Sequence, residues 1–410
     1  MPISFELTEA AQAARAYFHA MAADHMRPVS RKYDEHEHDL PREWVDYYWN
    51  EGRRGGPLRA GPLGAGPTDG MVQVCIQAEE LCWGDAGLYL RTPFAGLGGS
   101  AVAAAGTPEQ RRRFLSVFQS DGEPAWGAMA ITEPGAGSDS AAIQTTATLD
   151  GDEWVLNGTK IFCTGGEGAS TSQGGFVVVW ATVDKTAGRG GIKAFVVPAG
   201  TPGMTLVGLE KKLGIRASDT ATLRFENCRV SKDNLHGSAE VKRDSKAGGD
   251  KGFKGAMATF DASRPIVAAM AVGVGRAALD CLKEELGREG VHVRYDAPPA
   301  TQTALERDVI QMEAELQAAR LLTWRAASMM NRGRPNNLEA SMAKAKAGLA
   351  VTRITQKAVE WLGPRGYSKQ LLLEKWMRDA KINDIYEGTQ QINLLIVARR
   401  ILDYSSSMLR

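Results

Sequence analysis

The spacing of apolar residues divides the chain into regions of different character. Over residues 7–119, apolar side chains recur every three or four positions, most clearly in 10–26 and 72–83, which predicts helices. A Gly- and Pro-rich segment, 52–70, lies between these two stretches and is predicted to be a long irregular loop. A further helix is predicted to begin with a capping motif made of Thr107, Pro108 and Gln110.

From about residue 124 to 236 the apolar period changes to two, which is typical of strands. Asp150-Gly151 and Asn157-Gly158 each stand between alternating runs, and each is predicted to be a hairpin turn. Further strands, rich in β-branched and aromatic residues, are predicted at 176–181, 192–197 and 221–225. The middle region is therefore predicted to be a small antiparallel β domain.

Helical spacing returns after a polar stretch at 237–255. Pro265 is predicted to lie in the first turn of a helix that runs to about Leu286. Later helices are predicted over 305–333, 336–363, the run around Trp376, and 390–402. Long amphipathic helices with short links pack as a four-helix bundle. The predicted fold is α+β, with an all-α N-terminal domain at 1–123, a middle β domain at 124–240 and a C-terminal bundle at 241–410.

Composition and charge exclude several classes of protein. The chain has 410 residues and a net charge of +1, which gives no electrostatic footprint for nucleic acid. No apolar run approaches the ~20 residues needed to span a bilayer, so no membrane span is predicted. The five cysteines form no C-x-x-C pair, and the acidic N-terminus lacks a signal-peptide core, which predicts a cytoplasmic protein. No metal site is predicted, because His36 and His38 are two residues apart and share no helix face.

One carboxylate stands at a break between two predicted helices. Glu387 follows Tyr386 and precedes Gly388, and helical spacing resumes at about Gln390. A carboxylate at such a corner can be desolvated, and burial raises its pKa toward the pH at which a general base works. The alternative is a solvated residue at the end of an ordinary helix, and this segment alone favours that alternative.

Three dispersed segments together resemble the acyl-CoA dehydrogenase family. Residues 130–139 (AITEPGAGSD) resemble the family's first signature, and 252–265 (GFKGAMATFDASRP) resemble the entry to its helical bundle. Residues 378–389 (RDAKINDIYEGT) resemble its catalytic segment. The segments occur in the family's order, and the resemblance covers nearly the whole chain. It is far more specific than a lone Gly-rich motif.

The resemblance implies an FAD-dependent acyl-CoA dehydrogenase that converts an acyl-CoA thioester to the trans-2-enoyl thioester. In this family a carboxylate removes the α-proton while the β-hydrogen leaves as hydride to flavin N5. Electrons then pass to an electron-transfer flavoprotein. The α-proton of a thioester is weakly acidic, so the base must be poised and the developing enolate stabilised. The flavin supplies a redox capacity that no side chain has. The family also implies a homotetramer or dimer.

Individual roles follow from positions that match the family's motifs. Glu387 matches the catalytic base, whereas Ser263 occupies the place where some relatives carry the base and cannot serve as one. Cofactor contacts are implied for Met129, Ile131, Thr132, Ser138, Phe162, Thr164, Thr389 and Gln391. Substrate contacts are implied for Ser138, Arg264, Tyr386 and Gly388.

Several of these residues also have an ordinary structural interpretation. Thr132 and Ser138 flank a turn that begins at Glu133, where Ser and Thr are common in any protein. Phe162 suits the core of a strand, and Arg264 suits a surface charge in the first turn of a helix.

Two segments depart from the family pattern where a neighbouring subunit reaches the pyrophosphate of FAD. The family's Arg-x-x-Phe-Gly is replaced by a segment that has Arg288 but lacks Phe-Gly. Its Gln-x-x-Gly-Gly-x-Gly reads EWLGPRG at 360–366, where Pro364 removes a backbone donor and Arg365 could compensate. Arg288 and Arg365 are therefore candidate cofactor contacts, and the partner subunit could be a different chain.

The substrate and the exact activity stay open at this point. Arg91 could pair with an anionic tail of the substrate, with a surface Arg as the alternative. The segment 52–70 lacks the sequence that the family usually has in this loop on the substrate side, so the choice of substrate could be unusual. Alternative activities are those of family members that keep the base but act on another thioester. They include enzymes for carrier-protein thioesters, oxidases, and decarboxylating or desulfinating members. A non-catalytic subunit of a hetero-oligomer is a further alternative, against which the presence of Glu387 argues.

Overall fold

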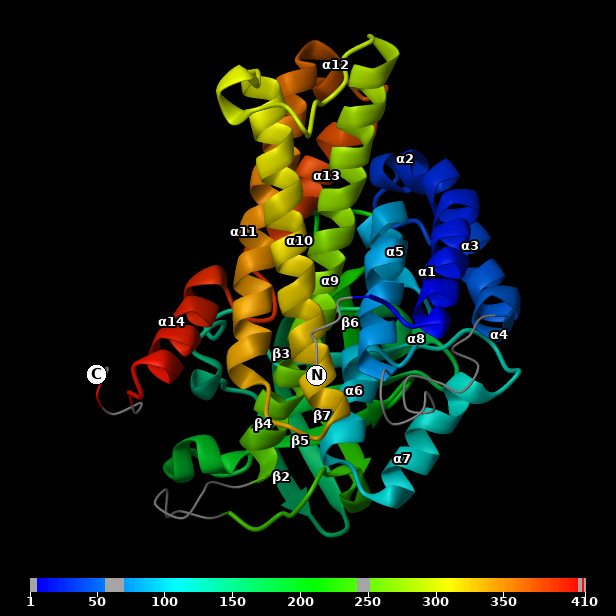
Figure 1. Cartoon of the computed structure of the whole chain (residues 1–410). Helices are drawn as coiled ribbons and strands as arrows, with labels where there is room; N and C mark the ends of the chain where they lie inside the picture. Colours follow the sequence, from blue (N-terminus) through cyan, green and yellow to red (C-terminus); the bar gives the residue numbers. More distant parts are fainter. Residues whose placement is uncertain (1–5, 56–69, 242–250, 405–407, 409–410) are drawn as a thin grey trace.

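The computed structural model describes residues 6–55, 70–241, 251–404 and 408. N-terminal helices lie beside a bundle of long helices, and a β-sheet lies at one end of both, at the bottom of Figure 1. The predicted loop at 52–70 falls largely outside the described residues. Of its ends, Gly52 closes a π-helical segment and Gly70 opens a helix.

The N-terminal region is helical, as predicted. Its helices are α1 (Glu9–Met21), α2 (Arg27–Glu35), α3 (Arg42–Tyr47), α4 (Arg53–Gly55), α5 (Gly70–Arg91), α6 (Gly96–Ala105) and α7 (Pro108–Leu115), with π-helical segments at Ala22–Met26 and Tyr48–Gly52 and a 3-10 turn at Ser116–Gln119. The predicted cap of α7 is confirmed, because Thr107 Oγ1 accepts the N–H of Gln110 at 3.2 Å and Gln110 Oε1 accepts the N–H of Thr107 at 2.9 Å. Asp85 interrupts α5 with φ −164°, and its carboxylate accepts the N–H of Leu88 at 2.9 Å, so the helix restarts and reaches Arg91.

Within the described residues, seven strands form one sheet. They are β1 (Gly127–Ala130), β2 (Thr146–Asp150), β3 (Glu153–Thr164), β4 (Phe176–Thr182), β5 (Ile192–Pro198), β6 (Met204–Leu209) and β7 (Thr220–Ser231), with α8 (Gly166–Thr171) after β3 and 3-10 turns at Ser140–Ala142, Lys185–Gly191 and Lys232–Asn234. The order is β1-β4-β2-β3-β7-β6, and β5 pairs with β4. Most pairs are antiparallel, as predicted, but β4 runs parallel to β1 and to β2. Strands β1 and β6 were not predicted from the sequence.

The two predicted hairpin turns have different outcomes. The turn at Asp150-Gly151 is confirmed, because Asp150 pairs with Glu153 across the β2–β3 hairpin and Gly151 has φ 62°. The turn at Asn157-Gly158 is wrong, because β3 runs unbroken through it. At Gly158 the register between β3 and β7 shifts, and a Cβ there would lie 2.4 Å from Thr145 Oγ1. This glycine permits a close approach between two segments instead of reversing the chain.

Three long helices run side by side in the C-terminal region, and the first two of them pack against α5 (Figure 1). They are α9 (Lys251–Arg288), α10 (Ala304–Asn331) and α11 (Asn337–Leu362), followed by α12 (Pro364–Tyr367), α13 (Leu373–Ala380), a 3-10 turn at Lys381–Asp384 and α14 (Gln390–Ile401); a 3-10 turn at Pro299–Thr301 precedes α10. The predicted start of α9 at Pro265 is wrong, because Pro265 lies inside the helix. The carbonyl of Asp261, which Pro265 cannot bond, accepts instead from Asn336 Nδ2 at 3.1 Å.

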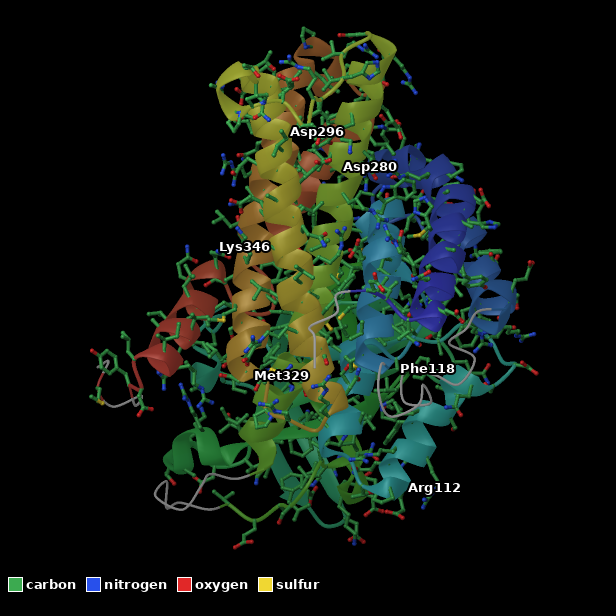
Figure 2. All side chains as sticks on the ribbon, in the orientation of Figure 1. Arg112, Phe118, Asp280, Asp296, Met329 and Lys346 are labelled. Atoms are coloured by element: carbon green, nitrogen blue, oxygen red, sulfur yellow. The ribbon has the colours of Figure 1, made fainter. Side chains whose placement is uncertain are left out.

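The helix α14 leaves the bundle and projects to one side, in contact with α11 (Figure 1). One hydrophobic core joins the N-terminal helices to the bundle and includes Trp44, Val272 and Trp376. Two further cores involve the sheet. Long polar side chains lie on the outer surface of the bundle, among them Lys346 on α11 (Figure 2). Lys346 forms an ion pair with Glu315 of α10.

One helix among the described residues, Thr259–Arg288, is long and apolar enough to cross a membrane by length and composition alone. No such apolar run was predicted from the sequence. The structure accounts for the apolar character, because 83% of the most apolar 18-residue stretch of this helix is buried inside the molecule. This segment of α9 is the central helix of the bundle.

Candidate active site

Glu387 lies in the break between α13 and α14, as the sequence predicted. Its backbone adopts the left-handed region with φ 51°, and Gly388 follows with φ 90°. Thr389 is the N-cap of α14, and its Oγ1 accepts the N–H of Ile392 at 3.3 Å. A left-handed conformation is uncommon for a residue other than glycine, and it persists where the surrounding structure enforces it, frequently at functional sites.

Two buried side chains fix this turn. Lys344 of α11 donates from Nζ to the carbonyl of Gly388 at 2.7 Å. Asn393 of α14 donates from Nδ2 to the same carbonyl at 2.8 Å and to the carbonyl of Thr389 at 3.0 Å. Both side chains are almost completely buried. The backbone that carries Glu387 is therefore held from two helices at once.

The carboxylate of Glu387 reaches back to α9. Ser263 Oγ donates to Glu387 Oε2 at 2.5 Å. The next residue, Arg264, is also buried and pairs with Asp261 at 2.9 Å. The interpretation of Arg264 as a surface charge is wrong. Ser263 cannot act as a base, but the same residue binds the base, a role that was not predicted from the sequence.

The protein around Glu387 tunes its pKa in both directions. Burial raises the pKa of the carboxyl, while the hydrogen bond from Ser263 and the positive charges of Arg264 and Lys344 lower it, and the net shift is upward. The residue keeps partial solvent exposure although protein surrounds its carboxyl. Burial also lowers the pKa of Lys344 to about 8, against the raising effect of Glu387 and Asp384. A carboxylate with a raised pKa and partial access has the properties of a general base.

The turn of the first signature is anchored by a buried ion pair. Lys160 of β3 donates from Nζ to Glu133 Oε1 at 2.7 Å and to the carbonyl of Ile131 at 3.0 Å. The Glu133 carboxylate also accepts the N–H groups of Gln144 at 2.6 Å and Thr145 at 2.9 Å. This ion pair was not predicted from the sequence. The available signal was a lysine at an inward-facing position of an alternating strand.

Phe162 is an exposed aromatic residue on a strained backbone. Its side chain is 58% exposed and its φ is 56°, at a register shift between Lys160 and Cys163 of β3. The interpretation of Phe162 as a strand core residue is therefore wrong. The N–H of Ile161 donates to the carbonyl of Thr132 at 2.9 Å, which brings the signature turn beside this bulge. An exposed ring held this way fits a planar aromatic ligand such as a flavin.

The other predicted cofactor positions lie on the same two elements or on α14. Met129 and Ile131 are buried in or just after β1, Thr164 is half-buried at the end of β3, and Ser138 is exposed. Gln391 is exposed on the first turn of α14. Three buried atoms near the Glu387 turn have no hydrogen-bond partner within the described part of the chain, and they are Arg264 Nε, Gln390 Oε1 and Asn393 Oδ1. Unsatisfied buried polar atoms of this kind fit a site that receives a polar ligand.

A loop of the β domain docks on the helix that leads to Glu387. The N–H of Ile215 donates to Asp379 Oδ1 on α13 at 2.5 Å. A Cβ at Gly214 would lie 2.4 Å from the backbone of Arg378, so the loop passes directly against the helix. The same loop contains Asp219, whose carboxylate accepts the N–H of Glu167 at 2.7 Å, close to the end of β3. The base and the β3 bulge are thus connected through one loop.

Arg91 is not available for an anionic substrate tail. Its guanidinium pairs with Glu167 at 2.5 Å and with Asp219 at 2.8 Å, and the side chain is almost fully buried. Two carboxylates therefore already compensate its charge, and the substrate-binding prediction is corrected. The alternative of a surface Arg is also wrong. Arg91 fastens the end of α5 to the β domain.

Tyr386, Arg288 and Arg365 lie elsewhere than at the Glu387 carboxylate. The Tyr386 hydroxyl donates to Asn383 Oδ1 at 3.2 Å and faces the bundle core. Arg288 and Arg365 both pair with Glu285, and Arg365 also pairs with Glu289 at 2.8 Å. They meet at the α12 end of the bundle, at the top of Figure 1, away from the sheet. Within one chain they do not join the candidate site, and their contact with a neighbour's cofactor stays a prediction.

Comparisons with known proteins agree with this arrangement. The chain matches the N-terminal, middle and C-terminal domains described as "Acyl-CoA dehydrogenase" over residues 8–121, 128–228 and 250–402. It is 42% identical over 297 residues to the bovine (Bos taurus) mitochondrial short-chain specific acyl-CoA dehydrogenase, covering 72% of this chain and 67% of that protein. It is 34% identical to the short-chain specific acyl-CoA dehydrogenase of Clostridium acetobutylicum, covering 97% and 100%. The solved structure of butyryl-CoA dehydrogenase from Megasphaera elsdenii superposes with a TM-score of 0.81 at 30% identity, covering 98% and 100%.

Proposed function

This chain belongs to the acyl-CoA dehydrogenase family, and from that premise we propose that it oxidises a short-chain acyl-CoA to the trans-2-enoyl thioester. The names of its short-chain relatives support the substrate class. The observation that carries the proposal is the setting of Glu387. Burial raises the pKa of this carboxyl, and the positive charges of Arg264 and Lys344 oppose the shift, which leaves a poised general base in a fixed turn.

The chain's own residues supply the proton chemistry. The Glu387 carboxylate removes the α-proton of the thioester, and the β-hydrogen leaves with its bonding electron pair as the Cα–Cβ double bond forms. FAD, when bound, supplies the acceptor for that hydride. Because Lys344 and Asn393 hold the turn in place, the carboxylate needs little reorganisation before it reacts.

The residues of the β3 bulge fit the flavin ring of FAD. Phe162 offers an exposed aromatic face, and Thr132 and Thr164 lie on the two segments that the bulge brings together. Thr389 and Gln391, at the start of α14, would hold the adenosine or pyrophosphate part. The unsatisfied atoms of Gln390 and Asn393 at the same helix end support a polar ligand there.

We also propose an electron-transfer flavoprotein as the acceptor of the electrons, on the ground of the family alone. A homotetramer or dimer is proposed as the assembly, with a hetero-oligomer as the alternative. Exposed apolar residues on the projecting α14, such as Leu394 and Leu395, support an interface between chains. A cytoplasmic location is proposed because all five cysteines are free thiols.

The test is the absorbance spectrum of the FAD-loaded protein during anaerobic titration with acyl-CoA thioesters of increasing chain length. We expect the visible flavin absorbance to bleach with a short-chain thioester and to stay unchanged in Glu387→Gln. The control is Glu284→Gln, which neutralises an exposed carboxylate on α9 and should bleach like the wild type.

Two outcomes would contradict the proposal. A protein that takes up no FAD would exclude a flavin-dependent reaction, and full bleaching in Glu387→Gln would exclude Glu387 as the base. Bleaching only with long or branched thioesters would leave the dehydrogenase but correct the substrate class.

A further inference from the structure

The structure assigns a role to Ser263 that goes beyond the proposed function and rests on it. We propose that Ser263 is a positioning residue, whose hydroxyl holds Glu387 Oε2 and leaves Oε1 as the oxygen that takes the α-proton. Ser263 Oγ lies 2.5 Å from Glu387 Oε2. That distance is in the range of a hydroxyl bonded to an ionised carboxylate. Among the described residues, no hydrogen bond or ion pair reaches Oε1, so the two oxygens of the base are not equivalent.

The hydroxyl has one proton and two possible acceptors. A serine in a helix commonly donates to a carbonyl of the preceding turn, and here the carbonyl of Phe260 lies 3.4 Å from Ser263 Oγ. The Glu387 oxygen is much closer, at 2.5 Å, and it carries charge. Because the single O–H can point at only one of them, it donates to the carboxylate.

The segment that carries Ser263 is rigid for a reason that the sequence shows. Pro265 has no N–H, so the carbonyl of Asp261 loses its partner within the helix. Asn336 Nδ2 replaces that partner at 3.1 Å, and Asn337 Nδ2 donates to the Asp261 carboxylate at 2.7 Å. Arg264 also pairs with Asp261 at 2.9 Å. Ser263 is therefore held before any substrate arrives, on an element separate from the turn that carries the base.

The hydrogen bond favours the ionised form of Glu387, and it works against the burial that raises the pKa of this carboxyl. Other charged and titratable groups face the same carboxyl and remain unchanged in a Ser263 variant. They are Arg264 on α9, Lys344 on α11, Tyr386 before α14 and Tyr89 on α5. Asp261 and Asp384 act in turn on Arg264 and on Lys344. Removing the hydroxyl therefore isolates one contribution among several.

The experiment compares the pH dependence of kcat and kcat/KM in Ser263→Ala and Ser263→Thr. In Ser263→Ala we expect the acid limb to move up by about one pH unit, the size expected for one hydrogen bond to a charged group. On the acid limb we expect kcat to fall by about tenfold while KM changes little, because Ser263 acts on the base and not on the bound thioester. Ser263→Thr keeps a hydroxyl and should restore the wild-type profile.

A second measurement does not depend on turnover. The carbonyl stretch of protonated Glu387, identified by its loss in Glu387→Gln, can be followed by infrared titration of the wild type and of Ser263→Ala. We expect its midpoint to shift upward by the same amount as the kinetic profile. If Ser263→Ala does not fold, Ser263→Cys supplies a variant of similar size with a weaker donor, and it should shift in the same direction.

Ser30→Ala is the matched control, because Ser30 is also a buried serine that donates to a carboxylate, that of Asp85, away from Glu387. It should lower stability and leave the pH profile unchanged. The proposal is overturned if Ser263→Ala keeps the wild-type acid limb, or if Ser263→Thr shifts as far as Ser263→Ala. If Glu387→Gln itself still turns over, the proposed function fails, and that result is distinct from either outcome for Ser263.

Discussion

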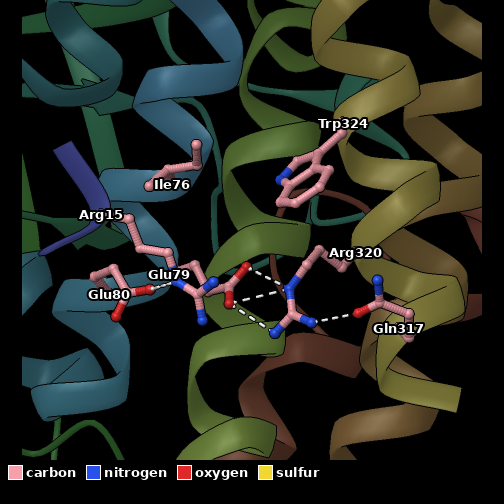
Figure 3. A pocket seen from close by; sticks show the side chains of 7 residues that line it. All are labelled: Arg15, Ile76, Glu79, Glu80, Gln317, Arg320 and Trp324. Carbon is pink, nitrogen blue, oxygen red and sulfur yellow. Dashed lines mark hydrogen bonds and ion pairs between the residues drawn. The ribbon is translucent and has the colours of Figure 1, made fainter. Parts of the chain in front are cut away.

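Two buried carboxylate sites in this molecule have opposite electrostatic outcomes. Glu79 and Glu80 lie on α5 where it meets α1, α9 and α10, and Figure 3 shows them facing Arg15 and Arg320. Glu80 accepts from Arg276 and from Arg15 Nε at 3.0 Å, and Glu79 accepts from Arg320 at 2.8–3.1 Å. The Glu387 carboxylate has a serine hydroxyl in place of these guanidinium groups.

The partners of a buried carboxyl decide whether its pKa ends above or below the ordinary value. Burial alone would raise the pKa of Glu80, but the hydrogen bonds and charge of Arg276 bring it below its ordinary value. Burial raises the pKa of Glu387 as well, and there Ser263, Arg264 and Lys344 only reduce the shift. The first site is a structural connection between two domains, and the second has the properties of the general base proposed above.

The largest expected effect separates the two sites by activity. Glu387→Gln should lower kcat by about 10²- to 10⁴-fold, the usual contribution of a general base. The same variant should not lower the thermal unfolding temperature, because it removes a buried charge that has no full ion pair. Steady-state kinetics and a thermal melt on the same sample check both statements. A large drop in the unfolding temperature would place Glu387 in the same structural class as Glu80.

The next effect is on stability at the ion-pair site. Glu80→Gln leaves Arg276 with fewer carboxylate contacts, and we expect the free energy of unfolding to fall by about 3 kcal/mol. This value is at the low end for a broken buried ion pair, because Glu79 still bonds Arg276. Urea unfolding measures this loss, and kcat of the folded fraction should stay near wild type. Glu109→Gln, which changes an exposed pair with Arg112, is the control and should keep the wild-type midpoint. A loss of kcat comparable to that of Glu387→Gln would contradict a purely structural role for Glu80.

The pH dependence of stability should differ in sign between the sites. The lowered pKa of Glu80 means that its stabilising contribution is present above its ordinary pKa of 4.5 and is lost as the pH falls through the lowered value. The raised pKa of Glu387 means that its contribution is complete below 4.5 and is lost as the pH rises through the raised value.

Urea unfolding across a pH series checks this difference. The stability advantage of the wild type over Glu80→Gln should narrow below pH 4.5, the ordinary carboxyl value. An advantage of Glu387→Gln over the wild type should open above pH 4.5. If the stability of the wild type minus that of the variant changes with pH in the same direction for both substitutions, the two carboxyls do not differ in the way described.

The smallest effect concerns the outer arm of the ion-pair site. The Arg15 side chain is 53% exposed although it bonds the buried Glu80 at 3.0 Å. Solvent screens such a pair, so Arg15→Ala should cost less than about 1 kcal/mol. A loss as large as that of Glu80→Gln would show that the outer arginine, and not Arg276, sustains the site.

The sequence allowed prediction where local chemistry decides the structure. The cap at Thr107, the turn at Asp150-Gly151 and the helix break at Glu387 each depend on a few neighbouring residues, and the structure has all three. Asn157-Gly158 has the same local signal as a hairpin, but β7 and Thr145 lie beside it, and these tertiary neighbours keep β3 straight.

The partners of the site residues could not be predicted, because they come from distant segments. Ser263 and Glu387 are 124 residues apart, and so are unrelated in any local pattern. In the sequence alone, Arg91 looks like a surface or substrate-binding residue. Only the fold shows that Glu167 and Asp219 pair with it. Pro265 indicated a helix start, whereas packing in the bundle continues α9 through it and Asn336 bonds the carbonyl that the proline leaves free.

The β-domain loop that contacts α13 provides a way to observe in solution how the β3 bulge and the Glu387 turn are aligned. The amide of Ile215 is bonded to Asp379 of another domain, and Asp379 is fully buried. Exchange of that single proton with solvent requires the loop to leave the helix, so its rate reports how often the domains separate. In a protein that keeps the site assembled between turnovers, this proton should exchange as slowly as those of the sheet interior, and substrate should not slow it further.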